Sequence, residues 1–126
     1  MSIPKNLMYT KTHEWVEIAD DGTAKVGITD FAQEELGDIV YINLPEKGQE
    51  VEKGEVLADI ESVKTAEDVY SPVSGTIVNI NEELIESPEC INEDAFGAWF
   101  AEIALCMDAD DLMTAEEYEQ YLEDEE

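Results

Sequence analysis

One side chain stands out among those that could take part in chemistry: the amine of Lys64, in the segment IESVKTAEDVY at residues 60–70. The chain has 33 acidic residues but only six lysines and no arginine, and no Lys, Arg or His follows Lys64. Because its direct neighbours are short or branched, the amine should project freely and could accept an acyl group from a modifying enzyme. The alternative interpretation is a solvated turn lysine that only aids solubility.

Residues for other kinds of catalysis are scarce. A nucleophilic triad would have to use His13, the only histidine, and a lone histidine at this position is more often structural. Cys90 and Cys106 lack the spacing of a metal site, and we expect free, buried thiols, with Cys106 filling the core, rather than a disulfide. No glycine-rich phosphate loop is present. The sequence therefore predicts a protein that is not an enzyme and holds no metal.

The net charge of −27 argues against binding to nucleic acid or to an anionic membrane, because phosphate contacts need Lys or Arg. The charge favours either solubility, including adaptation to high salt, or attraction to basic patches on protein partners. No stretch approaches the ~20 apolar residues of a membrane span. The N-terminus has neither a secretory signal nor a transit peptide pattern, so we expect a cytoplasmic protein, or a mitochondrial matrix protein if the chain is a processed form.

The elements that must position Lys64 begin with a predicted β-hairpin at residues 13–29, which turns at Asp21-Gly22. A short helix is predicted next, in TDFAQEELGD. Asp30 and Gln33 resemble a capping box there, and a glycine follows as the stop signal.

From Ile39 onward, short β-branched runs alternate with turns, which predicts antiparallel strands. Gly54 lies ten residues before Lys64 and Gly75 eleven after it. Two strands of similar length therefore flank the lysine and place it at or near a hairpin tip.

A final helix is predicted at about residues 114–123, with a capping box formed by Thr114 and Glu117. Its apolar stripe, which includes Tyr118, should dock on the sheet. No linker or low-complexity tract divides the chain, so residues 1–126 are expected to form one domain.

The segment ESVKTAEDVYSPVSG closely resembles the lipoyl-attachment segment of the glycine cleavage system H protein family. YTKTHEW, VGITDFAQEELGDIVYINLP and KGEVLADIESVK resemble that family upstream, as do NEDAFGAWF and TAEEYEQYL downstream. The resemblance runs from about Leu7 to Leu122. Lipoyl domains of 2-oxo acid dehydrogenases typically have a D-K-A tip and biotin carriers an M-K-M tip, so Val63-Lys64-Thr65 is similar to neither.

The resemblance implies a carrier in which Lys64 is amide-linked to lipoic acid. The tip residues that surround the lysine in the family's segment, and that would be recognised with it, are Glu61, Ser62, Val63 and Thr65. The implied fold is mainly β, the flattened, barrel-like β-sandwich of lipoyl and biotinyl carriers (a barrel-sandwich hybrid). Short helices are expected near the N-terminal third and at the C-terminus.

The resemblance also implies a set of partners. A lipoyl ligase or transferase would attach the arm, which accepts the aminomethyl group left when glycine decarboxylase removes CO₂. An aminomethyltransferase would then take this group onto tetrahydrofolate, and dihydrolipoyl dehydrogenase would reoxidise the dithiol. Tethering raises the local concentration of the intermediate to the order of mM. A monomer is expected, because the tip must reach several enzymes in turn.

Protection of the aminomethyl group from water is a further implication of the family. Its ammonium would be sheltered in a cleft with carboxylates, where the resemblance places Glu14 and Asp68, with Thr12 as a polar neighbour. The alternative is that Glu14 is an exposed strand residue and that Asp68 only solubilises the tip.

The sequence departs from the family pattern at Ala95, where the family usually carries Pro, and at Thr65, where Ala is common. The loop before Trp99 is also one residue short. Two other functions remain open at this point. One is a lipoyl relay that donates lipoyl groups to other proteins, and the other is an unmodified acidic module that binds a basic partner.

Overall fold

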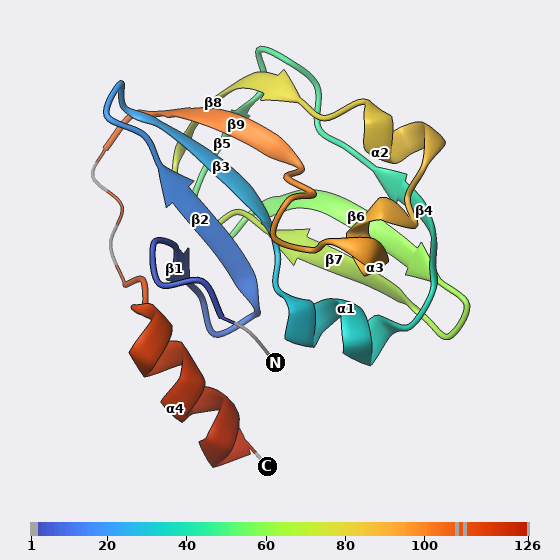
Figure 1. The fold of residues 1–126 in the computed structure, drawn as a ribbon. Helices are drawn as coiled ribbons and strands as arrows, with labels where there is room; N and C mark the ends of the chain where they lie inside the picture. Colours follow the sequence, from blue (N-terminus) through green and yellow to red (C-terminus); the bar gives the residue numbers. More distant parts are fainter. Residues whose placement is uncertain (1–2, 108, 110, 126) are drawn as a thin grey trace.

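The computed structural model describes residues 3–107, 109 and 111–125, whose strands form two antiparallel sheets (Figure 1). The larger sheet has six strands, in the order β1 (Met8–Tyr9), β2 (Glu14–Ile18), β3 (Thr23–Ile28), β9 (Ala101–Leu105), β8 (Gly75–Ile80) and β5 (Glu50–Val51). The smaller sheet has three strands, in the order β4 (Ile39–Asn43), β6 (Val56–Ser62) and β7 (Ala66–Tyr70). The predicted mainly β fold is confirmed, with two separate sheets rather than a closed barrel among the described residues.

The β2–β3 hairpin forms where the sequence predicts it. Val16 lies opposite Val26 in its register, and both side chains are fully buried. Gly22 adopts a φ of 87° in the turn, a left-handed conformation that a side chain would disfavour. The hairpin ends at Ile28, and only Thr29 separates it from the first helix.

Helix α1 (Asp30–Leu36) follows, but its cap differs from the prediction. The N-cap is Thr29, whose hydroxyl accepts a hydrogen bond from the backbone N–H of Ala32. Asp30 is already helical, and its carboxylate accepts a side-chain hydrogen bond from Gln33 at 2.8 Å instead of capping the helix. Gly37 ends the helix as expected, with a φ of 79°.

Two single-turn helices, α2 (Glu83–Glu86) and α3 (Cys90–Glu93), cover one end of the smaller sheet, whereas α4 (Ala115–Glu125) lies beside β1 (Figure 1). The predicted capping box of α4 is confirmed, since Thr114 and Glu117 exchange hydrogen bonds between side chain and backbone. None of the helices in the described ranges is long and apolar enough to cross a membrane.

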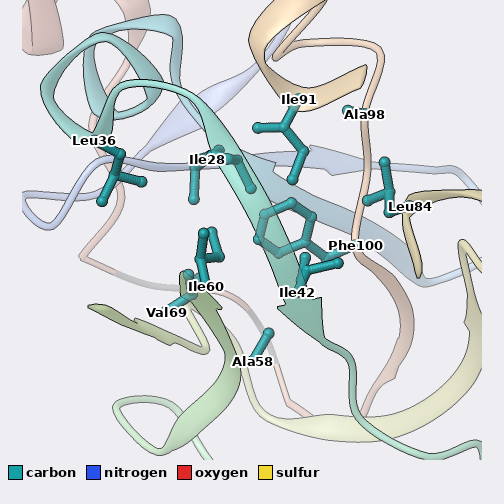
Figure 2. Close-up of a cluster of buried hydrophobic side chains, with 11 residues drawn as sticks. Ile28, Leu36, Ile42, Ala58, Ile60, Val69, Leu84, Ile91, Ala98 and Phe100 are labelled. Carbon is teal, nitrogen blue, oxygen red and sulfur yellow. The ribbon is translucent and has the colours of Figure 1, made fainter. Parts of the chain in front are cut away.

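A buried apolar cluster joins β4, β6 and β7 to α1, α2 and α3, with Phe100 at its centre (Figure 2). Its members are Ile28, Leu36, Ile39, Ile42, Ala58, Ile60, Val69, Leu84, Ile91, Ala98 and Phe100. Burying this much apolar surface is the main favourable term that fixes the smaller sheet against the helices. The hairpin that carries Lys64 is thus anchored at its base.

The expectation of two buried thiols is wrong. Both cysteines are free, as expected, but Cys106 is exposed and Cys90 is half-buried. Cys106 lies just beyond the end of β9, outside the strand whose apolar pattern suggested a core position.

Candidate functional site

The hairpin tip is the three-residue link Val63-Lys64-Thr65 between β6 and β7, so the predicted position of Lys64 is confirmed. The side chain of Ser62 organises the turn, because its Oγ accepts hydrogen bonds from the backbone N–H groups of Lys64 at 3.1 Å and of Thr65 at 3.2 Å. The N–H of Ser62 donates to the carbonyl of Thr65 at 2.8 Å. The tip is therefore an exposed but locally hydrogen-bonded turn.

Lys64 itself is exposed, and it forms no ion pair with any of the described residues. Its aliphatic chain passes close to the end of α1, where a Cβ added to Gly37 would lie 3.2 Å from Lys64 Cε. The N–H of Val63 donates to the carbonyl of Asp38 at 3.0 Å, which ties the tip to the same segment. Glu61 and Val63 are exposed beside the lysine, so an incoming enzyme can contact them together with the amine.

A cleft of about 340 Å³ begins at the tip residue Thr65 and runs between α1 and the edge strand β7. Its third wall is formed by Thr12, His13 and Glu14, from the loop that runs from Thr10 to Glu14. Its lining combines apolar side chains with four acidic ones. Glu14 belongs to β2, Glu35 to α1, and Glu67 and Asp68 to β7. The lining residues are Thr12, His13, Glu14, Ile28, Phe31, Ala32, Glu35, Leu36, Ile60, Thr65, Glu67, Asp68 and Val69.

Glu14 is the buried carboxyl of this cleft, with 3% of its surface exposed. Its Oε1 accepts hydrogen bonds from the hydroxyls of Thr10 at 2.7 Å and of Thr12 at 2.5 Å. Burial raises the pKa of Glu14 to about 7, although the two hydroxyls and the Tyr70 backbone oppose this by stabilising the anion. The alternative that Glu14 is an exposed strand residue is therefore wrong.

The other two residues expected in the cleft also line it, but they are exposed to solvent. Thr12 reaches Glu14 directly through its hydroxyl. Asp68 lies opposite Asp59 in the strand register, four residues after Lys64. The structure thus brings Thr12, Glu14, Asp68 and Thr65 to one cleft at the base of the lysine tip.

Two residues were missed by the sequence reasoning, one beside the cleft and one in its lining. Thr10 supplies the second hydroxyl on Glu14, and no local pattern marks it, because the contact depends on the folded loop. Glu67 lies opposite the fully buried Ile60, and it shares a strand face with the buried Val69. The two-residue alternation of strand side chains could have placed Glu67 on the cleft side of β7.

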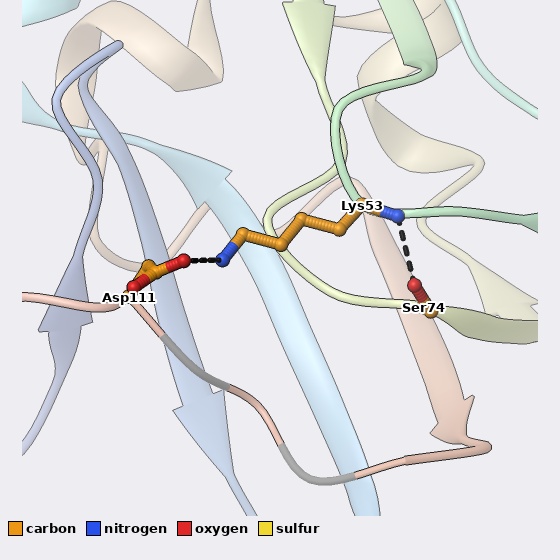
Figure 3. Close-up of polar contacts among 3 residues, drawn as sticks. All are labelled: Lys53, Ser74 and Asp111. Atoms are coloured by element: carbon orange, nitrogen blue, oxygen red, sulfur yellow. Dashed lines mark hydrogen bonds and ion pairs between the residues drawn. The ribbon is translucent and has the colours of Figure 1, made fainter.

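A second hollow, of about 470 Å³, also includes Thr12 and Glu14 in its lining. An ion pair lies at this hollow, with Lys53 Nζ 3.1 Å from Asp111 Oδ2, while the Lys53 backbone N–H donates to Ser74 (Figure 3). No residue of the hairpin tip lines this hollow. Of these two hollows, only the cleft at Thr65 therefore reaches the hairpin tip.

His13 lies in the wall of the cleft rather than among reactive side chains. Its backbone is left-handed, with a φ of 68°. Its Nδ1 lies 2.8 Å from the hydroxyl of Tyr118, and its ring contacts that of Phe31, with the centroids 4.6 Å apart.

The segment with Ala95, where the sequence departs from the family pattern, lies against Trp15. The indole N–H of Trp15 donates to the Ala95 carbonyl at 3.0 Å.

Comparisons with known proteins agree with this geometry. The sequence profile described as "Glycine cleavage H-protein" matches residues 7–125. The chain is 54% identical to a probable glycine cleavage system H protein of Pyrococcus abyssi, with 95% of this chain and 92% of the relative covered. It is 55% identical to the glycine cleavage system H protein of Coprothermobacter proteolyticus, with 97% and 98% covered.

A solved structure extends the likeness to the fold. The crystal structure of a glycine cleavage system H protein from Mycobacterium marinum superimposes with a TM-score of 0.88 at 37% identity, covering 98% of both chains. Sequence, fold and the exposed lysine tip thus agree. The chain belongs to the glycine cleavage H-protein family, and it is a lipoyl-carrying shuttle of the glycine cleavage system rather than an enzyme.

Proposed function

We propose that Lys64 is the residue that carries the lipoyl group, through an amide on its Nζ, and that the adjacent cleft shelters the aminomethyl cargo. The single observation that supports this most strongly is the position of an exposed lysine at a hydrogen-bonded tip, directly beside a cleft with a buried carboxyl. A modifying enzyme can reach the amine, and the hydrogen-bonded turn holds the attachment point steady.

The residues of the tip fit such a group. Lys64 is exposed and unpaired among the described residues, so acylation of its amine breaks no ion pair. We expect the ligase or transferase to recognise Glu61, Ser62, Val63 and Thr65, which surround the amine. When bound, the lipoyl group supplies a dithiolane that takes up the aminomethyl group and is reoxidised after its release.

The cleft residues fit the cargo, whose amine is protonated near neutral pH. Glu14 can accept a charge-assisted hydrogen bond from this ammonium, and such bonds are stronger when they are shielded from water. Thr10 and Thr12 hold the carboxylate in place through their hydroxyls. Asp68 lies at the exposed side of the cleft, where we expect it to attract the ammonium rather than to bury it.

The partners follow from the family. We expect glycine decarboxylase to load the arm, the aminomethyltransferase to unload it and dihydrolipoyl dehydrogenase to reoxidise it. The relatives described above are archaeal and bacterial, which favours a cytoplasmic location. We further propose that residues 1–126 act as one lipoyl-carrier domain and as a monomer, since each enzyme must approach the same tip.

Intact mass spectrometry of the protein from its native host tests the attachment site. A lipoyl-sized increment that maps to Lys64 is expected, and Lys64→Arg should abolish both the increment and the glycine–bicarbonate exchange with glycine decarboxylase. Lys53→Arg is the matched control, because it alters a lysine outside the tip and should leave both unchanged. Persistent absence of the increment in cells that lipoylate other proteins would instead indicate an unmodified acidic module.

A further inference from the structure

Tyr118 of helix α4 places a buried hydroxyl behind two walls of the cleft. Tyr118 is fully buried, and its OH lies 2.7 Å from Thr29 Oγ1 and 2.8 Å from His13 Nδ1. His13 lines one wall of the cleft, and Thr29 caps the helix that forms another. His13 belongs to the loop that contains Thr12 and Glu14, and the helix capped by Thr29 is α1.

The loop needs such support because of its backbone. His13 has a φ of 68°, in a region that non-glycine residues adopt at a cost in free energy and that persists only when the surroundings enforce it. The carbonyl of His13 accepts a hydrogen bond from the Thr29 N–H at 3.0 Å, and its own N–H donates to Thr10. Thr29 thus supports His13 in two ways. Its backbone N–H binds the His13 carbonyl directly, and its hydroxyl is linked to the His13 ring through the hydroxyl of Tyr118.

Packing fixes the ring of Tyr118 independently of its hydroxyl. The ring stacks on Tyr9, with centroids 4.7 Å apart and an angle of 8° between the planes. Removing only the hydroxyl should therefore leave α4 docked and change only the link between the two walls. A second tyrosine of the same helix offers a comparison, since the OH of Tyr121 donates to the carbonyl of Lys11 at 3.2 Å in an exposed position.

We propose that Tyr118 is a positioning residue for the cleft: its hydroxyl joins the Thr10–Glu14 loop to the start of α1 and keeps Glu14 where it can hold the cargo. The effect of Tyr118 on the cargo rests on the function proposed above, whereas the link that Tyr118 makes between the two walls does not. Helix α4 then has a part in protecting the cargo, although it contributes no residue to the cleft lining.

Hydrogen–deuterium exchange on the unmodified protein tests the link itself. In Tyr118→Phe we expect the amides of His13, Glu14 and Thr29 to exchange about two- to tenfold faster than in the parent, the range set by one lost hydrogen bond. The exchange rates of the β8 and β9 amides should be unchanged, whereas a general loss of stability would raise them too. Tyr121→Phe should change the same three amides less than about twofold. Equal exchange of these amides in Tyr118→Phe and the parent would overturn the proposal.

Loss of the cargo from the loaded protein tests the consequence. Hydrolysis consumes one water, breaks the C–S and C–N bonds of the aminomethyl group, and leaves a thiol, formaldehyde and ammonium. We expect Tyr118→Phe to release ammonium about two- to tenfold faster than the parent and Tyr121→Phe. Faster amide exchange with an unchanged release rate would reject the positioning role. If Lys64 proves unmodified, the function proposed above fails, and the exchange measurement alone decides whether Tyr118 joins the walls.

Discussion

The lysine tip and the Thr10–Glu14 loop meet at one cleft, but they are built in opposite ways. The tip is exposed, and most of the hydrogen bonds of its turn join residues no more than three apart in sequence, from Ser62 to Thr65, with one bond from Val63 to the more distant Asp38. The loop contains a buried carboxyl, and the hydroxyl that we propose positions it belongs to Tyr118 of α4, 105 residues from its partner His13.

This difference matches the different tasks that we propose for them. An attachment site must be reached by several enzymes, so local hydrogen bonds that leave the amine in water suit it. A protective site must exclude water, which requires walls from several elements of the fold. The low-dielectric surroundings of Glu14 also make its interaction with a cation stronger than that of an exposed carboxylate.

Replacing Glu14 and Asp68 one at a time should show the largest difference in effect between a buried carboxyl and an exposed one. In the loaded protein, we expect Glu14→Gln to speed loss of the aminomethyl group by about tenfold to a hundredfold, as for a lost charge-assisted hydrogen bond. Asp68→Asn should speed it by about fivefold at most, because solvent screens an exposed charge. The measurement is ammonium release from the isolated protein at neutral pH.

Glu17→Gln is the matched control, since Glu17 is an exposed acid of the same strand, outside the cleft lining. Equal decay rates in Asp68→Asn and the parent would remove Asp68 from the proposal. Equal rates in Glu14→Gln and the parent would reject the cleft as the site of protection.

The tip could be predicted from sequence because its determinants are local. Gly54, Gly75 and the alternation of short strands placed Lys64 at a hairpin tip, and the motif around it carried the family resemblance. The cleft could be predicted only by resemblance. Nothing local distinguishes the buried Glu14 from the exposed Glu17 three residues later, because burial arises when α1 and β7 close over the loop.

The incorrect predictions also concern features that depend on the folded structure rather than on local sequence. A capping box was expected at Asp30, but the preceding Thr29 caps α1 and also contacts Tyr118 from the far end of the chain. Cys106 was expected in the core because it follows an apolar run, yet β9 ends at Leu105 and leaves the thiol exposed. Local patterns gave the type of the hairpin, of α1 and of α4 correctly, whereas the ends of elements such as α1 and β9 depended on distant contacts.

The burial of Glu14 should be visible in the pH dependence of stability, without any cargo. Because its pKa is raised from 4.5 to about 7 in the fold, the folded chain binds this proton more tightly than the unfolded chain does. The stability that Glu14 contributes is therefore present in full below the unfolded value and is lost as the pH rises through 7.

Glu14→Gln removes this pH-dependent contribution to stability. Its free energy of unfolding, relative to that of the parent, should rise by about 2 kcal/mol between about pH 5 and pH 8, as measured by urea denaturation. The difference between the two proteins cancels the titration of the many other acids, which both share. A constant difference across this range would mean that Glu14 keeps an ordinary pKa, and the contrast between the buried loop and the exposed tip would lose its electrostatic basis.

The smallest expected effect belongs to the tip. Ser62→Ala removes the acceptor for the N–H groups of Lys64 and Thr65, but water can replace it at this exposed turn. We therefore expect a purified lipoyl ligase to modify the variant only about two- to fivefold more slowly, followed as the mass increment over time. Ser62→Thr keeps the hydroxyl and should restore the parental rate. Once loaded, both variants should lose the aminomethyl group at the parental rate, because Ser62 is not in the cleft lining. A faster loss in Ser62→Ala would show that the turn also shapes the cleft, so that attachment and protection are not separate tasks of two regions.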